Sequence, residues 1–465
     1  MRVQTPLPPH ALWSTCLRAC ALAGLAAAFG AQAQSLLEMY QAAQGYDASY
    51  QAAQAQFDAT SAKSEQVLAL YAPVVSLQGS VKQDWQQSKT YTASYDATTE
   101  KNETSGALSL QFSQALYNRQ NELSLTAAQR SAALVELTMA TVRQDLMVRV
   151  SSAYFDVLAA RDSLEFVRAQ KAAVAEQLAA AKRNFEVGTT TITDTREAQA
   201  RFDLVIAQEI SAQNELTVKS SLLDQLVGRS GLKPKSLRLP LQLPAVLGTD
   251  NEWAALTEQY LPQIQSKRTE LELARIETEK ARADTSPTVS LTGALGKGFY
   301  PFGGSNSAND TTGVNTYTRN RDSQTASMGV VINVPLFTGT VRAAKLRETL
   351  AMEDKARNDL EALKRNAQQT TRSVFYGLHS LAGQVKAFEA AEASSQSALD
   401  ANRLGYEVGV RINIDVLNAQ SQLYDTKAKL AKARYDMLVN NLRLRQSAGT
   451  LAESNLEEID GLLLK

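Results

Sequence analysis

Apolar residues recur at helical spacing along a long stretch of this chain. Successive members are three or four residues apart, which places them on one narrow face of a helix. They are Val142, Leu146, Val150, Ala153, Val157, Ala160, Leu164 and Val167. No proline occurs in 74–233 or in 336–465, and an interior proline would break a helix. A single helix over 117–187 would be about 105 Å long, so the pattern predicts a coiled coil or an elongated helical assembly.

Four shorter segments instead alternate apolar and polar residues, as a strand with two unlike faces does. The segments are 75–81, 108–112, 289–295 and 328–334. Each predicts a strand of about ten residues. Polar residues 84–104 would join the first pair as a loop, and residues 303–322, rich in Gly, Ser, Asn and Thr, would join the second. A soluble sheet with one wet face and the wall of an outer-membrane barrel both give this alternation, and both interpretations stand at this point.

Part of the sequence occurs twice. The tripeptide Glu-Val-Gly at 186–188 returns at 407–409, and the same offset carries Asp194 onto Asp415. A constant offset over such a distance indicates a duplicated structural unit. We therefore predict a first structural repeat over 34–248 and a second over 249–465. Each repeat runs helix, strand, loop, strand, long helix, tight turn and helix.

Residues 1–33 have the pattern of a secretory signal peptide. Arg2 and Arg18 supply positive charge, an apolar run follows, and Ala-Gln-Ala at 31–33 is a cleavable motif. A membrane anchor is one alternative, but the run is well short of the roughly 20 residues that a spanning helix needs. A lipoprotein signal at Cys16 or Cys20 is another, but the apolar stretch follows these cysteines instead of preceding them. Both cysteines lie within this segment, so the exported chain would carry no disulfide and no metal-binding thiolate.

The composition argues against several classes of function. Lys plus Arg and Asp plus Glu number 48 each, without the basic excess of a nucleic-acid-binding protein. Beyond residue 33 the one histidine is His379, which fits an ordinary helix residue better than a metal ligand. The sequence has no nucleophile elbow, phosphate-binding loop or zinc-protease motif, so we expect neither an enzyme nor a cofactor. Residues 454–465 show no periodic pattern that predicts structure.

Four strands cannot close a barrel, and lipid offers no hydrogen-bond partner to an open strand edge. If the membrane interpretation holds, the strands must close against other copies of the chain. The alternative is a soluble periplasmic coiled-coil scaffold or adaptor, which would share the signal peptide and the helices. Such a protein would lack strands with an apolar outer face.

At its two predicted turns the chain is similar to a known family. Residues 184–194 resemble the first helix-hairpin turn of TolC-type outer-membrane export channels, and residues 406–417 resemble the second. Segments 153–158 and 334–339 also match patterns of the family, and the similarity covers essentially the whole exported chain. It is closer to the type I secretion and drug-efflux members than to the lipid-anchored members.

The resemblance implies an α+β membrane protein that works as a homotrimer. Three chains would build a twelve-strand β-barrel in the lipid of the outer membrane, continued by a twelve-helix α-barrel in the periplasm. The helix-hairpin turns would close the far end until a periplasmic adaptor and an inner-membrane translocase, ABC-type or proton-driven, dock there. The channel itself would do no chemistry, and the sequence does not identify its cargo.

Position by position, the resemblance assigns an aperture gate to Asp194, Tyr406 and Arg411, whose links would hold the inner helices closed. Asp415 matches a carboxylate that faces the axis, where three copies would form a ring that attracts cations. The family's second carboxylate, one helical turn further on, falls on Asn418 here. This departure predicts weaker block by multivalent cations than two acidic rings would give.

These residues also have ordinary structural interpretations. Asp194, three residues before Glu197, fits a capping box at the start of a helix, and Asp415 could likewise cap a helix. Gly188 and Gly409 fit left-handed helix C-caps that allow the hairpin, with docking of the adaptor as a secondary role.

Overall fold

The computed structural model describes residues 34–91, 96–238, 248–307, 316–318, 321–337 and 339–464. The predicted signal peptide lies outside these residues. The chain forms two compact units, which we call the helical unit and the sheet unit. The helical unit comprises the described residues within Met1–Ala55, Leu137–Gln265 and Ala362–Lys465, and the sheet unit comprises those within Gln56–Glu136 and Ser266–Glu361.

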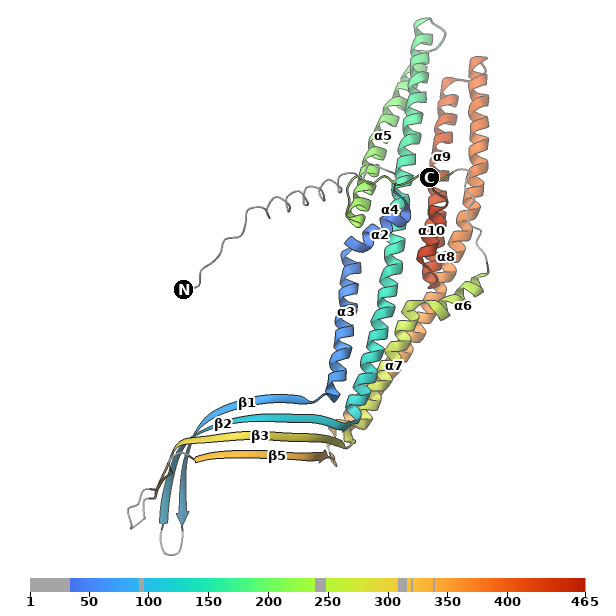
Figure 1. The fold of residues 1–465 in the computed structure, drawn as a ribbon. Helices are drawn as coiled ribbons and strands as arrows, with labels where there is room; N and C mark the ends of the chain where they lie inside the picture. Colours follow the sequence, from blue (N-terminus) through green and yellow to red (C-terminus); the bar gives the residue numbers. More distant parts are fainter. Residues whose placement is uncertain are drawn as a thin grey trace, which may run out of the picture. The chain divides into compact units, whose positions relative to one another are not determined.

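Both halves of the chain contain the predicted order of helix, strand, strand, long helix, turn and helix (Figure 1). The first half has α2 (Leu36–Tyr46), α3 (Ala48–Leu68), η1 (Ala69–Tyr71), β1 (Val74–Tyr91), β2 (Asp96–Asn118), α4 (Arg119–Glu186) and α5 (Ile192–Val227). The second half has α6 (Asp250–Tyr260), α7 (Pro262–Arg282), η2 (Ala283–Thr285), β3 (Thr288–Ser307), β4 (Thr316–Thr318), β5 (Arg321–Asn333), α8 (Val341–Glu407), α9 (Asn413–Ser447) and α10 (Glu453–Asp460). The boundary between the repeats at 248 and 249 stays a prediction.

The two long helices confirm the prediction made from the absence of proline. α4 has 68 residues and α8 has 67. α4 begins two residues after the predicted start at 117 and ends one residue before the predicted end at 187. The predicted apolar stripe of α4 faces the interior, with Leu146, Val150, Val157 and Leu164 buried. Among the described helices, none has the combination of length and apolar character that a membrane crossing requires.

The strands form one antiparallel sheet in the order β1, β2, β3 and β5, with the short β4 also paired to β3. β1, β2, β3 and β5 have 18, 23, 20 and 13 residues, so the predicted length of about ten was wrong. Much of the predicted loops 84–104 and 303–322 is strand. Pairing continues through polar partners such as Gln83 and Thr104. Where both faces of a strand carry polar side chains, the sequence does not alternate between apolar and polar residues, so the pattern did not predict this part of the strands.

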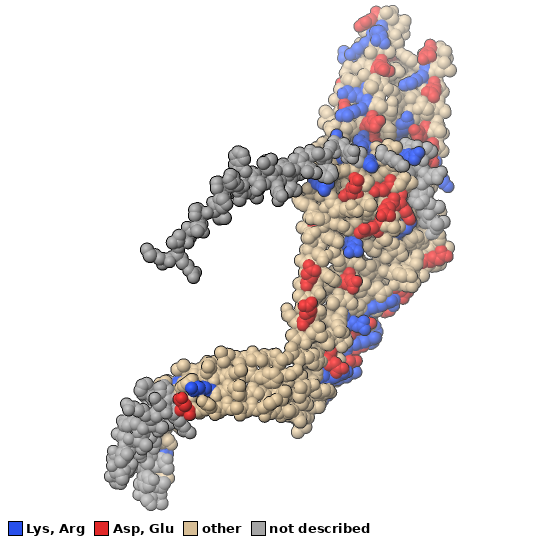
Figure 2. Space-filling model, viewed as in Figure 1, with Lys and Arg blue, Asp and Glu red and all other residues tan. Residues whose placement is uncertain are grey.

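One face of the sheet is apolar and exposed. Cross-strand partners lie on the same face, and the register places Leu77, Leu110 and Leu295 in one row across β1, β2 and β3. Leu77 is 68% exposed, and Figure 2 shows a broad stretch of the sheet surface without Lys, Arg, Asp or Glu. The opposite face is polar. There the amide of Gln111 donates to Gln78 Oε1 at 3.0 Å.

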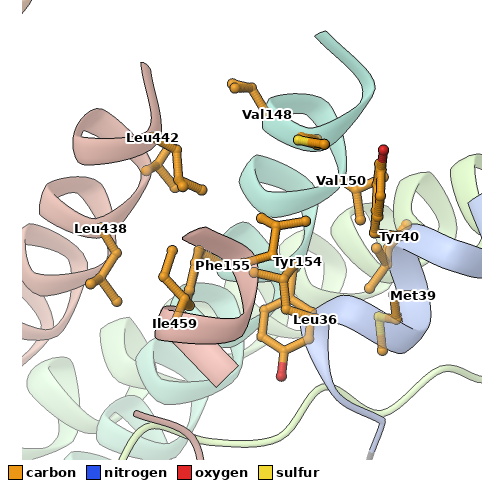
Figure 3. Close-up of a cluster of buried hydrophobic side chains, with 14 of the residues drawn as sticks. Leu36, Met39, Tyr40, Val148, Val150, Tyr154, Phe155, Leu438, Leu442 and Ile459 are labelled. Atoms are coloured by element: carbon orange, nitrogen blue, oxygen red, sulfur yellow. The ribbon is translucent and has the colours of Figure 1, made fainter. Parts of the chain in front are cut away.

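The helical unit has its main core where α2, α4, α5, α9 and α10 meet (Figure 3). Tyr154 and Phe155 of α4 are buried, and Phe155 stacks on Tyr435 of α9 with ring centroids 5.8 Å apart. The hydroxyl of Tyr154 donates to the carbonyl oxygen of Lys235 at 3.0 Å, and burial raises the pKa of Tyr154. The motif at 153–158 is therefore a packing motif. A buried aromatic side chain of this kind is worth about 3–5 kcal/mol relative to alanine.

The C-terminal helix α10 was not predicted. Its Leu456 and Ile459 are buried in the main core of the helical unit. The carboxylate of Asp460 accepts hydrogen bonds from the backbone N–H of Leu36 at 2.8 Å and of Leu37 at 3.2 Å. It thereby caps two of the free N–H groups at the start of α2. The end of the chain thus fixes the first described helix in place.

Candidate functional site

Two tight turns join α4 to α5 and α8 to α9 within the helical unit (Figure 1). Gly188 and Gly409 have φ angles of 81° and 79°, in the left-handed region that glycine adopts without strain. In both turns the N–H after the glycine donates to a carbonyl five residues earlier, at 2.9 Å. Both turns are therefore Schellman motifs. This geometry agrees with the interpretation of the two glycines as helix C-caps.

Asp194 stabilises the start of α5. Its Oδ2 accepts from the backbone N–H of Thr191 at 3.1 Å and from the hydroxyl of Thr191 at 3.0 Å. Thr191 Oγ1 in turn accepts a hydrogen bond from the backbone N–H of Asp194 at 3.3 Å, which completes a capping box. The predicted box of Asp194 with Glu197 was wrong, because α5 begins at Ile192 and Asp194 is its third residue. All the described contacts of this carboxylate use Oδ2.

The start of α9 has no side-chain cap. Ile412 occupies the N-cap position and makes no capping hydrogen bond. Asp415 lies in the first turn, where a carboxylate is favourable beside the helix N-terminus, but it is not the cap that the alternative interpretation expected. Its Oδ2 lies 3.7 Å from Nη1 of Arg411. Exposed ion pairs of this kind contribute only about 0–1 kcal/mol.

Two contacts join the first hairpin, α4 and α5, to the second hairpin, α8 and α9. Nδ2 of Asn184 donates to the hydroxyl oxygen of Tyr406 at 3.4 Å. Nη2 of Arg201 in α5 donates to Oδ1 of Asn418 in α9 at 2.6 Å. The structure therefore brings Tyr406 against the end of α4 and Asn418 against α5 of the first hairpin.

The predicted gate residues are not bonded to one another among the described residues of a single chain. Among the described contacts, none joins Asp194 to Tyr406 or to Arg411. The predicted gate residues therefore lie at the same two turns without forming a closed network inside one chain. Among the described residues, no group of His, Cys, Asp and Glu is arranged to hold a metal ion.

Two amide side chains of α9 are buried without partners. Asn413 and Gln420 are 2% and 1% exposed, and neither polar atom of either amide has a hydrogen-bond partner among the described residues. A buried polar group left unpaired costs about 1–3 kcal/mol. The counterpart of Gln420 in the first repeat is Gln199, which is partly exposed and donates to Asp203 at 2.9 Å. The first part of α9 and the first part of α5 therefore differ in how well their polar side chains are satisfied.

Ion pairs tie the helices of the first hairpin, α4 and α5, together. The carboxylate of Glu209 lies 2.8 Å from Nζ of Lys171 and 3.2 Å from Nε of Arg168. The hydrogen bond from Lys171 is the main cause that lowers the pKa of Glu209. In the second hairpin, α8 and α9, Nη2 of Arg434 lies 2.9 Å from Glu389. One carboxylate in the first hairpin thus binds two cations.

The sequence matches the family described as Outer membrane efflux protein over residues 39–229 and 254–450. It is 35% identical over 362 residues to the outer membrane protein TolC of Vibrio cholerae, covering 76% of this chain and 78% of that protein. It is 36% identical over 318 residues to the alkaline protease secretion protein AprF of Pseudomonas aeruginosa, covering 68% of this chain and 63% of that protein.

Solved structures share the fold. The outer membrane protein VceC of Vibrio cholerae superposes with a TM-score of 0.72 at 18% identity, covering 89% of this chain and 96% of that chain. The outer-membrane channel OprN superposes with the same TM-score and identity, covering 89% of this chain and 90% of that chain. The α+β fold expected from the sequence, with four main strands and long helices, is confirmed.

Proposed function

Because this chain belongs to the outer membrane efflux protein family, we propose that it works as a trimer with a gate at its helix turns. The protein is an outer-membrane exit duct for efflux or type I secretion, located in the outer membrane and extending into the periplasm. A soluble periplasmic scaffold, the alternative that the sequence left open, is therefore rejected. In the proposal, a periplasmic adaptor and an inner-membrane translocase open the duct.

The open edges of the sheet support the trimer. β1 and β5 each pair with one strand among the described residues, and an unpaired edge in lipid costs several kcal/mol for each backbone group. Pairing β1 of one copy with β5 of the next satisfies both edges. Three copies with four main strands each then close a twelve-strand barrel, which lies within the range of outer-membrane barrels.

The apolar face of the sheet has the extent that a membrane requires. Val289 and Phe299 lie on this face of β3, about 33 Å apart along the strand. A strand tilt of about 40° reduces this to about 25 Å, the height of the apolar band of outer-membrane barrels. Near one limit, Nζ of Lys297 lies 4.9 Å from the ring centroid of Phe299 and 3.9 Å from Asp322. A lysine there can extend its amine out of the lipid.

The proposed gate consists of Asp194, Tyr406 and Arg411. The capping box engages one oxygen of Asp194, so the other oxygen is available to a neighbouring subunit. Arg411 is 58% exposed, and its guanidinium has five donors, more than one carboxylate can use. Links of this kind between subunits, repeated around a threefold axis, would hold the turns closed.

The proposed constriction lies beside the gate. Three copies of Asp415 would form the acidic ring, and Asn418 would face the duct one turn further along α9. The exposed turns at Gly188 and Gly409 would be the docking surface for the adaptor. Movement of the turns by the docked partners would separate the gate residues and widen the duct.

The gate is tested by single-channel conductance in a planar bilayer. Arg411→Ser combined with Tyr406→Phe should raise the conductance of the purified trimer, because the links that these two side chains make at the gate are lost. Lys432→Ser is the matched control, since it removes an ion pair of α9 several turns away and should leave the conductance unchanged. Unchanged conductance in the double variant would exclude these residues from the gate. Material that stays monomeric without detergent would exclude the trimer.

A further inference from the structure

Arg201 places a cation beside the proposed constriction. Its hydrogen bond to Oδ1 of Asn418 is 2.6 Å long and joins α5 to α9. Asn418 follows Asp415 by three residues, so both lie on the same side of α9. Arg201 also lines a groove between α4, α5 and α9, in which the carboxylates of Glu215 and Asp425 lie further along the helices.

The charges at this point do not cancel. The amide oxygen of Asn418 accepts a hydrogen bond but carries no net charge, whereas the guanidinium of Arg201 stays protonated at every physiological pH. Asp415 is already paired with Arg411, at 3.7 Å. Asp415, Asn418 and their two arginine partners therefore carry one net positive charge in each chain. A carboxylate at position 418 would instead have paired with Arg201 and left the group neutral.

We propose that Arg201 determines the ion specificity of the duct. Three copies form a cationic ring next to the acidic ring of Asp415, and the pair of rings favours anionic solutes over cations. A ring of charged side chains selects ions by their sign, and this one acts within a screening length of about 8 Å at physiological salt. The inference rests on the proposed trimeric channel.

The test is the ion selectivity of the purified trimer in a planar bilayer with a KCl gradient. Arg201→Gln keeps a hydrogen-bond donor for Asn418 but removes the charge. It should move the reversal potential toward that of K⁺ and strengthen block by La³⁺ about tenfold. Asn418→Asp, which pairs the arginine, should produce a shift in the same direction. The double variant should bind La³⁺ more tightly than either single variant, because it carries one further negative charge per chain.

Two variants separate charge from structure. Arg201→Lys keeps the charge and loses the planar donor group, so its reversal potential should equal that of the unaltered channel. Lys432→Gln, on α9 several turns away, should also change nothing. An unaltered reversal potential in Arg201→Gln, or a shift in Arg201→Lys as large as in Arg201→Gln, would overturn the inference while the channel still conducts. An unaltered protein that forms no channel would instead refute the proposed function itself.

Discussion

The two helix turns end the first helix in the same way and begin the next in different ways. Where α4 and α8 end, Gly188 and Gly409 form the same C-cap with nearly the same φ. Where the next helix begins, Thr191 and Asp194 form a complete capping box for α5, whereas Ile412 offers no cap at all to α9. A side chain therefore satisfies a backbone N–H at the start of α5, and no N-cap side chain does so at the start of α9.

This difference indicates which turn moves more easily. The second hairpin contacts the first through Tyr406 at the turn and through Asn418 in α9. The first eight residues of α9 also contain the unpaired amides of Asn413 and Gln420. Segments with few satisfied local groups open at the lowest free-energy cost. We therefore expect the α8–α9 turn to open before the α4–α5 turn.

The largest expected effect comes from removing an unpaired amide. Gln420→Leu replaces a buried side chain without partners by an apolar one of similar size, and should stabilise the second hairpin by about 1–2 kcal/mol. Slower amide hydrogen exchange over 413–420 would measure this gain. Gln199→Leu is the matched control in the first repeat. It loses a bond to Asp203 and should bring no gain, and equal gains at both positions would refute the comparison.

Part of this comparison could be predicted from the sequence. The repeated Glu-Val-Gly located both turns, and the two glycines have the conformation that the C-cap interpretation required. The difference in capping was visible too, because Thr191 stands where the second repeat has Ile412. It was missed because the start of α5 was expected at Asp194. Leu456 and Ile459 likewise have helical spacing, but a helix as short as α10 gives too few turns to establish a period.

The remaining features depend on tertiary packing. The bond between Arg201 and Asn418 joins positions 217 residues apart, so no local pattern contains it. The burial of Gln420 and the partial exposure of Gln199 follow from which face of each helix is covered, although both residues occupy the same place in their repeats. The length of the strands was missed for a similar reason, since backbone pairing does not require an apolar side chain.

The glycine C-caps that the two turns share give the next effect. Gly188→Ala and Gly409→Ala should each destabilise their turn by about 1–2 kcal/mol, the cost of a left-handed residue with a side chain. Apart from the glycine and its chain neighbours, no described residue has a heavy atom within 4 Å of the added Cβ at either position, so the cost comes from the backbone conformation alone. Faster amide exchange just after each glycine would measure it. Gly377→Ala in the middle of α8 is the control, and it should stabilise the helix by about 0.5–1 kcal/mol.

A smaller effect should come from giving α9 the N-terminal cap that α5 has. Ile412→Thr introduces a hydroxyl three residues before Asp415, and should stabilise the start of α9 by about 0.5–1 kcal/mol through a new capping box. Thr191→Ala should remove about the same amount from α5. Thermal unfolding and amide exchange of the two variants would give both values. If Ile412→Thr leaves the exchange of α9 unchanged, the missing cap does not distinguish the turns.

The smallest expected effect is a loss of stability of the first hairpin at low pH. Lys171 and Arg168 depress the pKa of Glu209 below its ordinary value of 4.5. The ionised carboxylate therefore makes its full contribution to the stability of the first hairpin above that pH. The stabilisation shrinks as the pH falls below that value and ends once the depressed pKa is passed, because the protonated group no longer attracts the two cations. Amide exchange of α5 around residue 209 should therefore accelerate between pH 5 and pH 3, beyond the intrinsic change with pH. Glu209→Gln should abolish this pH dependence, and an identical acceleration in that variant would show that other carboxylates cause it.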